Sequence, residues 1–159
     1  MKEPIFKNLT EKEDSAIAAL IRNNLESFHL DIPGTAYYDE GLDHLSAYYD
    51  NPRRAYFVLM EEDTVVGGVG LAELDGMEEC CEMQKLYLND RVKGQGLGYA
   101  LIRRVEEEAK RLGYRRIYLE THSALEAAVH LYEKCGYRRI DRPKELVHSA
   151  MDLFYQKEL

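Results

Sequence analysis

A glycine-rich segment near the middle of the chain has residue types that could bind a phosphate. It reads Arg91-Val92-Lys93-Gly94-Gln95-Gly96-Leu97-Gly98-Tyr99. The three glycines lower helix propensity at the start of a predicted helix, let the backbone approach a ligand, and leave N–H groups that favour an anion. With Arg91 and Lys93 beside them, they predict a phosphate or pyrophosphate cradle. The alternative is a turn in which glycine serves only tight packing.

Two nucleotide-binding motifs match this segment only in part. A P-loop places Lys and then Ser or Thr after its last glycine, whereas Lys93 precedes the glycines here. The dinucleotide fingerprint needs a third glycine where this chain has Tyr99, although Glu120 could take the place of its ribose-binding acid. Half of the residues precede the segment, while a dinucleotide-binding unit normally begins its domain. A dinucleotide-binding protein is therefore the less favoured alternative.

The elements that must position this segment begin with an amphipathic helix. Thr10 and Glu13 have the spacing of a capping box, with Thr10 at the N-cap and Glu13 at N3. An apolar stripe then follows on a helix of about fifteen residues, at Ile17, Leu20, Ile21 and Leu25. The turn residues 31–35 end this helix, and a shorter one is predicted at 42–49.

Apolar runs and turn residues predict strands from residue 55 onward. Strands at 55–60 and 64–74 flank a polar hairpin turn, and a third strand covers 79–88. The glycine segment then opens a helix at 97–112, which Gly113 ends.

The last third of the chain is predicted to contain a strand, a helix and two further strands. After a strand at 115–120, Ser123 and Glu126 form a second capping box that opens a helix reaching Cys135. Strands at 137–140 and 150–156 close the chain. The predicted order is β-α-α-β-β-β-α-β-α-β-β, a mixed α/β (α+β) sheet and not a regular βαβ array.

The composition fits one globular domain over residues 1–159. Hydrophobic residues make up 45% and charged residues 31%, which excludes a disordered tail. The formal charge of −8 argues against nucleic-acid binding but leaves room for a local basic site. No apolar run approaches the ~20 residues of a membrane span, and the first residues lack a signal-peptide core. We expect a cytoplasmic protein that binds neither nucleic acid nor a membrane.

The cysteines and histidines do not predict a metal site. The three cysteines form no C-x-x-C pair, and Cys80 and Cys81 are adjacent in a predicted strand, so they point to opposite faces. The five histidines are scattered: His29, His44, His122, His130 and His148. We therefore expect no metal cofactor.

Three motifs in sequence order resemble those of one family. The segment Arg91-Val92-Lys93-Gly94-Gln95-Gly96 fits the acetyl-CoA loop of the GCN5-related N-acetyltransferases, in which Gln or Arg is followed by x-x-G-x and then Gly or Ala. Residues 82–88 resemble the fourth strand of that family. Residues 131–137 read Leu-Tyr-Glu-Lys-Cys-Gly-Tyr and resemble its downstream element. The resemblance covers nearly the whole chain and implies a GNAT-like domain.

The resemblance implies how acetyl-CoA would be held. In the family the fourth and fifth strands splay apart, and the pantetheine arm lies between them against the backbone of the fourth strand. This assigns the backbone of Leu86 and Leu88 to pantetheine and the N–H groups from Lys93 to Tyr99 to the pyrophosphate. The implied cofactor-binding residues are Leu86, Tyr87, Leu88, Arg91, Lys93, Gly94, Gln95, Gly96, Leu97, Gly98, Tyr99, Leu125, Ala128, Tyr132 and Lys134. One position departs from the family: Leu125 stands where Asn is frequent, so an Asn contact to the cofactor is absent.

The resemblance also implies an activity, direct transfer of an acetyl group from acetyl-CoA to a primary amine. An alkyl ammonium of pKa about 10.4 must lose a proton before it attacks, so a base or a water relay is useful. Glu82 lies where family members often have a base or a substrate-binding carboxylate; the alternative is a solvated glutamate. Strand alternation predicts Glu82, Gln84 and Leu86 on one face. Glu79 and Glu120 are weaker candidates.

Tyr132 matches the family tyrosine that protonates the departing thiolate. A phenol of pKa about 10 can do so only at close range. The alternative is a core tyrosine that packs on Leu131 and Val129.

The acceptor site is expected between the first two helices, as is usual in the family. Residues 28–40 carry acidic and aromatic side chains, including Tyr37 and Tyr38, which suit a cationic amine. A solvated loop has a similar composition. A different class of function, a sensor that binds acetyl-CoA without turnover, stays open at this stage. Homodimers are common in the family, and 150–156 is the strand expected at such a contact.

Overall fold

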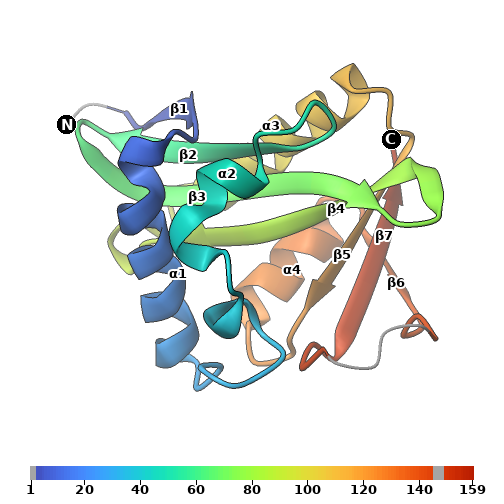
Figure 1. Ribbon diagram of the computed structural model, residues 1–159. Helices are drawn as coiled ribbons and strands as arrows, with labels where there is room; N and C mark the ends of the chain where they lie inside the picture. Colours follow the sequence, from blue (N-terminus) through green and yellow to red (C-terminus); the bar gives the residue numbers. More distant parts are fainter. Residues whose placement is uncertain (1–2, 145–148) are drawn as a thin grey trace.

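A seven-stranded sheet forms the centre of the computed structural model, which describes residues 3–144 and 149–159 (Figure 1). The strand order is β1-β2-β3-β4-β5-β7-β6. Only β4 and β5 are parallel; the other neighbours are antiparallel. The strands are β1 (Ile5–Asn8), β2 (Ala55–Glu61), β3 (Thr64–Leu74), β4 (Met77–Leu88), β5 (Arg116–Thr121), β6 (Arg138–Ile140) and β7 (Leu153–Glu158). The predicted mixed α/β fold and its order of elements are confirmed.

Helices cover both faces of this sheet. The α-helices are α1 (Asp14–Ser27), α2 (Leu45–Tyr48), α3 (Leu97–Arg111) and α4 (Glu126–Lys134). Short 3-10 helices lie at Glu11–Glu13, Ala36–Tyr38, Leu42–His44 and Asp90–Val92. Figure 1 shows α1 and α2 on one face and α3 and α4 on the other. The helix predicted at 42–49 is thus a 3-10 turn followed by the short α2.

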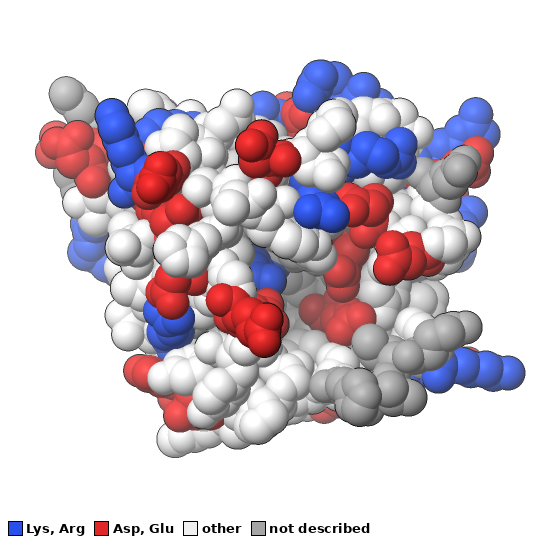
Figure 2. All heavy atoms as spheres, viewed as in Figure 1, with Lys and Arg blue, Asp and Glu red and all other residues white. Residues whose placement is uncertain are grey.

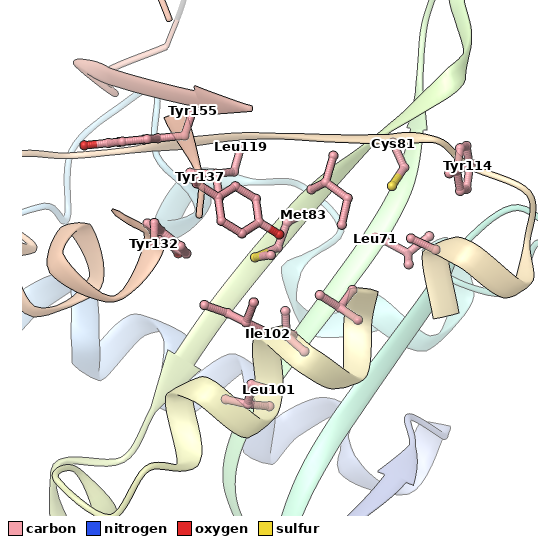
Figure 3. Close-up of a cluster of buried hydrophobic side chains, with 14 of the residues drawn as sticks. Leu71, Cys81, Met83, Leu101, Ile102, Tyr114, Leu119, Tyr132, Tyr137 and Tyr155 are labelled. Carbon is pink, nitrogen blue, oxygen red and sulfur yellow. The ribbon is translucent and has the colours of Figure 1, made fainter. Parts of the chain in front are cut away.

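Two buried clusters join the helices to the sheet. The apolar stripe of α1 is buried on one face, as its spacing predicts. On the other face, Leu101 and Ile102 of α3 pack with Met83 of β4 and Tyr132 of α4 (Figure 3). Burying one such Leu or Ile stabilises the fold by about 1.5–3 kcal/mol. These contacts fix the helices that border the site.

The capping box predicted for the first helix is present, whereas the second one is not. At the first, the N–H and the hydroxyl of Thr10 both donate to the Glu13 carboxylate, at 3.0 and 2.9 Å. At the second, the N–H and hydroxyl of Ser123 donate instead to Asp152, at 2.8 and 2.7 Å. The Asp152 carboxylate competes for both donors, so α4 begins at Glu126.

The closing strand begins later than the predicted residue 150. The N–H of Ala150 donates to the carbonyl of Gly34 at 3.1 Å, outside the sheet. Ala150 therefore contacts the segment that follows α1 and lies outside the strand. The strand β7 runs from Leu153 to Glu158 beside β5.

The parallel strands β4 and β5 diverge after a short paired stretch. They pair between Cys80–Glu82 and Arg116–Tyr118. Beyond that point β4 stays with β3 as far as Leu88, while β5 stays with β7. This separation is the splay that the family resemblance implies, and it opens the centre of the sheet.

A β-bulge in β4 changes which side chains face the splay. Gly68 pairs with Tyr87 and Gly70 with Gln84, so β4 has one extra residue in this interval. Lys85, with φ of +52°, adopts the left-handed conformation there.

The bulge makes the predicted shared face of β4 wrong for Leu86, whereas Glu82 and Gln84 do share a face. Before it, Cys81 and Met83 face the cluster under α3 and α4; after it, Leu86 and Leu88 do. Glu82 therefore faces the opposite side from Leu86. Simple alternation fails because the extra residue shifts the pattern by one.

Candidate functional site

A cavity of about 180 Å³ lies where β4 and β5 separate. Its lining comes from β4, β5, α1, α3, α4 and the connection before β7. Figure 2 shows a hollow on the face of the molecule seen there, with acidic side chains gathered around it. Eight of the predicted cofactor residues line the cavity: Leu86, Tyr87, Leu88, Lys93, Gly98, Leu125, Ala128 and Tyr132.

The glycine segment leaves a row of backbone donors at the start of α3. Gly94 and Gly96 have φ of +81° and +76°, a conformation that side chains disfavour. Among the described residues, no acceptor takes a hydrogen bond from the N–H groups of residues 94–99. They add to the positive end of a long helix dipole, so the segment fits a phosphate or pyrophosphate.

Gly98 has a different role, close packing between helices. A Cβ at this position would lie 2.7 Å from Cδ2 of Leu131 and 3.6 Å from Cδ1 of Leu88. Its absence lets the first turn of α3 approach α4 beside the cavity.

The two basic residues of the segment lie in different places. Lys93 lines the cavity, with Nζ 2.7 Å from Asp90 and 5.4 Å from the centre of the Phe28 ring. Arg91 is exposed and pairs with Glu61 at 2.5 Å, away from the cavity lining.

The remaining predicted cofactor residues lie outside the cavity. Gly94 and Gln95 are exposed in the loop, and Leu97 begins α3 behind it. Gly96 and Tyr99 border a shallow groove with Arg103 on the outer side of α3. Lys134 is exposed in the last turn of α4.

Glu82 ends a chain of hydrogen bonds on the face toward α2. The hydroxyl of Tyr49 donates to the Gln84 carbonyl oxygen at 2.6 Å, and the Gln84 amide donates to Glu82 at 2.7 Å. Burial raises the pKa of the Glu82 carboxyl, and the charge of Glu120 raises it further. A carboxylate with a raised pKa is a better proton acceptor than an exposed one.

Glu82 is not among the residues that line the cavity, whereas Glu120 lines it from β5. Glu120 accepts hydrogen bonds from the hydroxyls of Tyr118 and Ser149, each at 3.0 Å. Glu79, the other weak candidate, is exposed at the paired end of β4.

Tyr132 lies at the edge of the buried cluster and also lines the cavity. Its side chain is 6% exposed and packs near Tyr137 and Tyr155, with ring centres 6.1 and 6.3 Å away (Figure 3). Its hydroxyl bonds to no other described residue, and burial raises its pKa. It is thus both a packing residue and a protonated hydroxyl at the cavity.

The predicted acceptor tyrosines do not line the cavity. The hydroxyl of Tyr37 donates to Glu26 at 2.6 Å, and Tyr38 is 59% exposed. Their segment reaches the cavity through Asp39, whose carboxylate lies 2.8 Å from Nζ of Lys85.

Other lining residues were not predicted from the sequence. Asn24 and Leu25 come from α1, Lys85 and Thr121 from the two strands, and Met151 from the connection before β7. Phe28, which directly follows α1, also lines the cavity and belongs to the segment 28–40 predicted for the acceptor. Nothing in the spacing of these residues points to a common site, because only the fold brings them together.

A larger, open groove of about 870 Å³ lies beside α2. Its three arginines are each paired with a glutamate: Arg54 with Glu73, Arg104 with Glu107, and Arg111 with Glu108. It is separate from the glycine segment and offers no comparable set of uncommitted donors.

The described residues contain no cluster of three or more His, Cys, Asp or Glu side chains suited to a metal. His148 lies outside the described residues. Within the described part of the chain, no helix has the length and apolarity that a bilayer crossing requires.

Comparisons with known proteins agree with this geometry. The family model described as Acetyltransferase (GNAT) family matches residues 20–137. The uncharacterized N-acetyltransferase YjgM of Escherichia coli (strain K12) is 38% identical over 142 residues, covering 88% of this chain and 85% of that protein.

Solved structures share the fold at low identity. A GNAT-family acetyltransferase from Staphylococcus aureus Mu50 superposes with a TM-score of 0.85 at 19% identity, covering 98% of each chain. PaiA N-acetyltransferase from Thermoplasma acidophilum, solved in complex with coenzyme A, has a TM-score of 0.79 at 15% identity, covering 99% of this chain and 100% of that one.

Proposed function

The chain belongs to the acetyltransferase (GNAT) family, whose members carry out acetyl-CoA-dependent acetyl transfer, and we propose that it acetylates a primary amine by direct transfer. The observation that carries the proposal is the cavity at the strand divergence. It extends from Lys93 and Gly98, beside the donors of α3, to Glu120 on β5.

The residues present fit acetyl-CoA, which supplies an activated acetyl thioester when bound. The N–H groups from Gly94 to Tyr99, with Lys93, would hold its pyrophosphate. The edge of β4 that faces β5 has no strand partner after Glu82, so the backbone of Leu86 and Leu88 can bond the pantetheine arm. Leu125 and Ala128 of the α4 region would contact the same arm.

Two side chains have the properties that proton transfer requires. Glu82, with its raised pKa, would take the proton of the amine directly or through water. Tyr132, which is protonated at neutral pH, would give a proton to the departing sulfur. These roles are consistent with positions on opposite sides of the splay.

Two further expectations remain predictions. A cytoplasmic location is one. A homodimer is the other, and β7 is covered by β5 on one edge and by β6 on the other between Phe154 and Gln156. The outer strands β1 and β6 have free edges instead.

The test is thiol release from acetyl-CoA with a panel of primary amines, with the acetylated products identified by mass. We expect product that depends on both substrates. Binding of acetyl-CoA without product from any amine would instead support the sensor function, and preferential binding of NAD would support the dinucleotide alternative.

A further inference from the structure

Two glutamates near the cavity differ from the other buried or half-buried glutamates of the described chain, because they have no lysine or arginine partner. Seven described glutamates are buried or half-buried, and five of them pair with a lysine or arginine. The pairs are Glu13 with Lys7, Glu61 with Arg91, Glu73 with Arg54, Glu106 with Lys157, and Glu108 with Arg111. Glu82 and Glu120 have only neutral hydrogen-bond donors, namely Gln84, Tyr118 and Ser149.

Glu82 and Glu120 lie on the same face of the sheet, and Glu120 also lines the cavity. Glu82 pairs in register with Tyr118, and Glu120 lies two residues further along β5 on the same face. At the usual strand spacing their Cα atoms are about 8 Å apart. The charge of Glu120 raises the pKa of Glu82, as expected for neighbouring carboxylates.

Among the described residues, neither carboxylate forms an ion pair with a nearby cation, although the charge of Lys85 lowers the pKa of Glu82. Lys85 lines the cavity but is paired with Asp39 at 2.8 Å. The guanidinium of Arg142 donates to the carbonyls of Met151 and Ser149, at 3.0 and 3.1 Å. Figure 2 shows the resulting acidic surroundings of the hollow. Shielding a charge without a partner is costly, so a cationic ligand would be favoured here.

The cavity has a second feature that points to a ligand. Tyr132, only 6% exposed, places a hydroxyl at its wall that no other described residue bonds. The reacting nitrogen must be a neutral amine when it attacks, because an ammonium ion has no free electron pair. It therefore cannot neutralise both carboxylates at the moment of reaction.

We propose that the acceptor carries a second cationic group, as a linear aliphatic diamine does, and that Glu120 binds this group while Glu82 faces the reacting amine. This inference rests on the proposed function, since it names the substrate class of the same site. Glu120 is a specificity residue in this scheme, held in place by the hydroxyls of Tyr118 and Ser149.

The test compares three amines that differ only at the far end: cadaverine, pentylamine and 5-aminopentanoate. We expect kcat/KM for cadaverine to exceed that for pentylamine at least about tenfold, with 5-aminopentanoate the poorest, since a hydrogen bond between charged groups contributes this much. In Glu120→Gln the ratio of cadaverine to pentylamine should fall toward one. Glu62→Gln, an exposed change in the β2–β3 turn, removes the same charge and should keep the ratio.

Binding gives a readout that does not depend on turnover. In the presence of CoA, cadaverine should raise the Tm of the wild type more than pentylamine does, and this difference should vanish in Glu120→Gln. Equal effects of the amines in both assays, or a preference for 5-aminopentanoate, would overturn the inference. Acetylation of pentylamine would still support the proposed function in that case.

Discussion

At the scale of single residues, Glu82 combines burial with a route for protons. Its carboxylate accepts from Gln84, and the raised pKa comes mainly from burial. If it is the base, kcat/KM should rise with pH through an inflection above the ordinary Glu value of 4.5. Glu82→Gln should lose that inflection and lower kcat/KM by about 10²–10⁴-fold. Rate profiles against pH check this, and an unchanged inflection in the variant would assign it to another group.

The raised pKa of Glu82 should affect stability in the opposite direction: the free energy of unfolding should fall over the pH range in which kcat/KM rises. Because the folded pKa lies above the unfolded value, the folded chain binds more protons between the two values. The free energy of unfolding contributed by Glu82 therefore falls as pH rises through that window. The Tm of Glu82→Gln relative to wild type should therefore increase as the pH rises above the ordinary Glu value of 4.5. Glu79→Gln, at an exposed position of β4, is the control and should show no such trend.

At Tyr132, the contribution of the hydroxyl can be measured separately from that of the ring. Tyr132→Phe keeps the ring beside Tyr137 and Tyr155 and removes a hydroxyl that bonds to no other described residue. Acetyl-CoA affinity and Tm should therefore change little. The single-turnover rate should fall at least tenfold, because a general acid contributes roughly 10²–10⁴-fold. An unchanged single-turnover rate would reduce Tyr132 to a packing residue.

At the scale of elements, the sequence predicts most of the sheet correctly. The strand at 64–74 has the predicted bounds, and the helix at 97–112 differs by one residue at its end. These elements have strong apolar periodicity and clear turn residues. These patterns depend only on neighbouring residues, so the elements that they predict also form in the folded protein.

The sequence does not predict features that depend on hydrogen bonds between residues far apart in the chain. Lys85 gives no local sign of a bulge, because the extra residue is defined by pairing with β3. Ser123 has the right neighbours for a cap, but Asp152 takes its hydrogen bonds from across the sheet. The contribution of α1 to the cavity has the same origin. Such features depend on the packed fold and not on spacing along the chain.

The glycine loop allows a matched pair of substitutions. Gly96 and Gly76 have φ of +76° and +78°, and no atom lies within 4 Å of a Cβ built at either. Valine at either site should therefore cost about 1–2 kcal/mol through backbone strain. Only Gly96→Val should also weaken acetyl-CoA binding at least tenfold, because it obstructs backbone approach at the cradle. Calorimetry on both variants separates the effects; equal affinities would mean that the loop is only a turn.

At the scale of the whole molecule, the splay divides the sheet into two parts with a short joint. Across that joint, β4 and β5 pair only between Cys80–Glu82 and Arg116–Tyr118. Beyond it, β4 and α3 line one side of the cavity, and β5 and α4 line the other side. A ligand that fills the cavity would contact both parts at once. It would thereby add the contacts that the diverging strands lack.

Acetyl-CoA should therefore raise the Tm more than NAD or ATP does at equal concentration. All three ligands carry phosphates for the N–H groups of the α3 start, but only acetyl-CoA has an arm that can enter between β4 and β5. At about 100 Kd it should add about 2.7 kcal/mol to the free energy of unfolding. For a chain of this size that corresponds to a Tm increase of roughly 5–10 °C. Thermal melts with each ligand check the order, and Gly96→Val should show a smaller increase with acetyl-CoA. A larger increase with NAD than with acetyl-CoA would contradict this prediction, because it would place the stabilising contacts at the cradle and not between the strands.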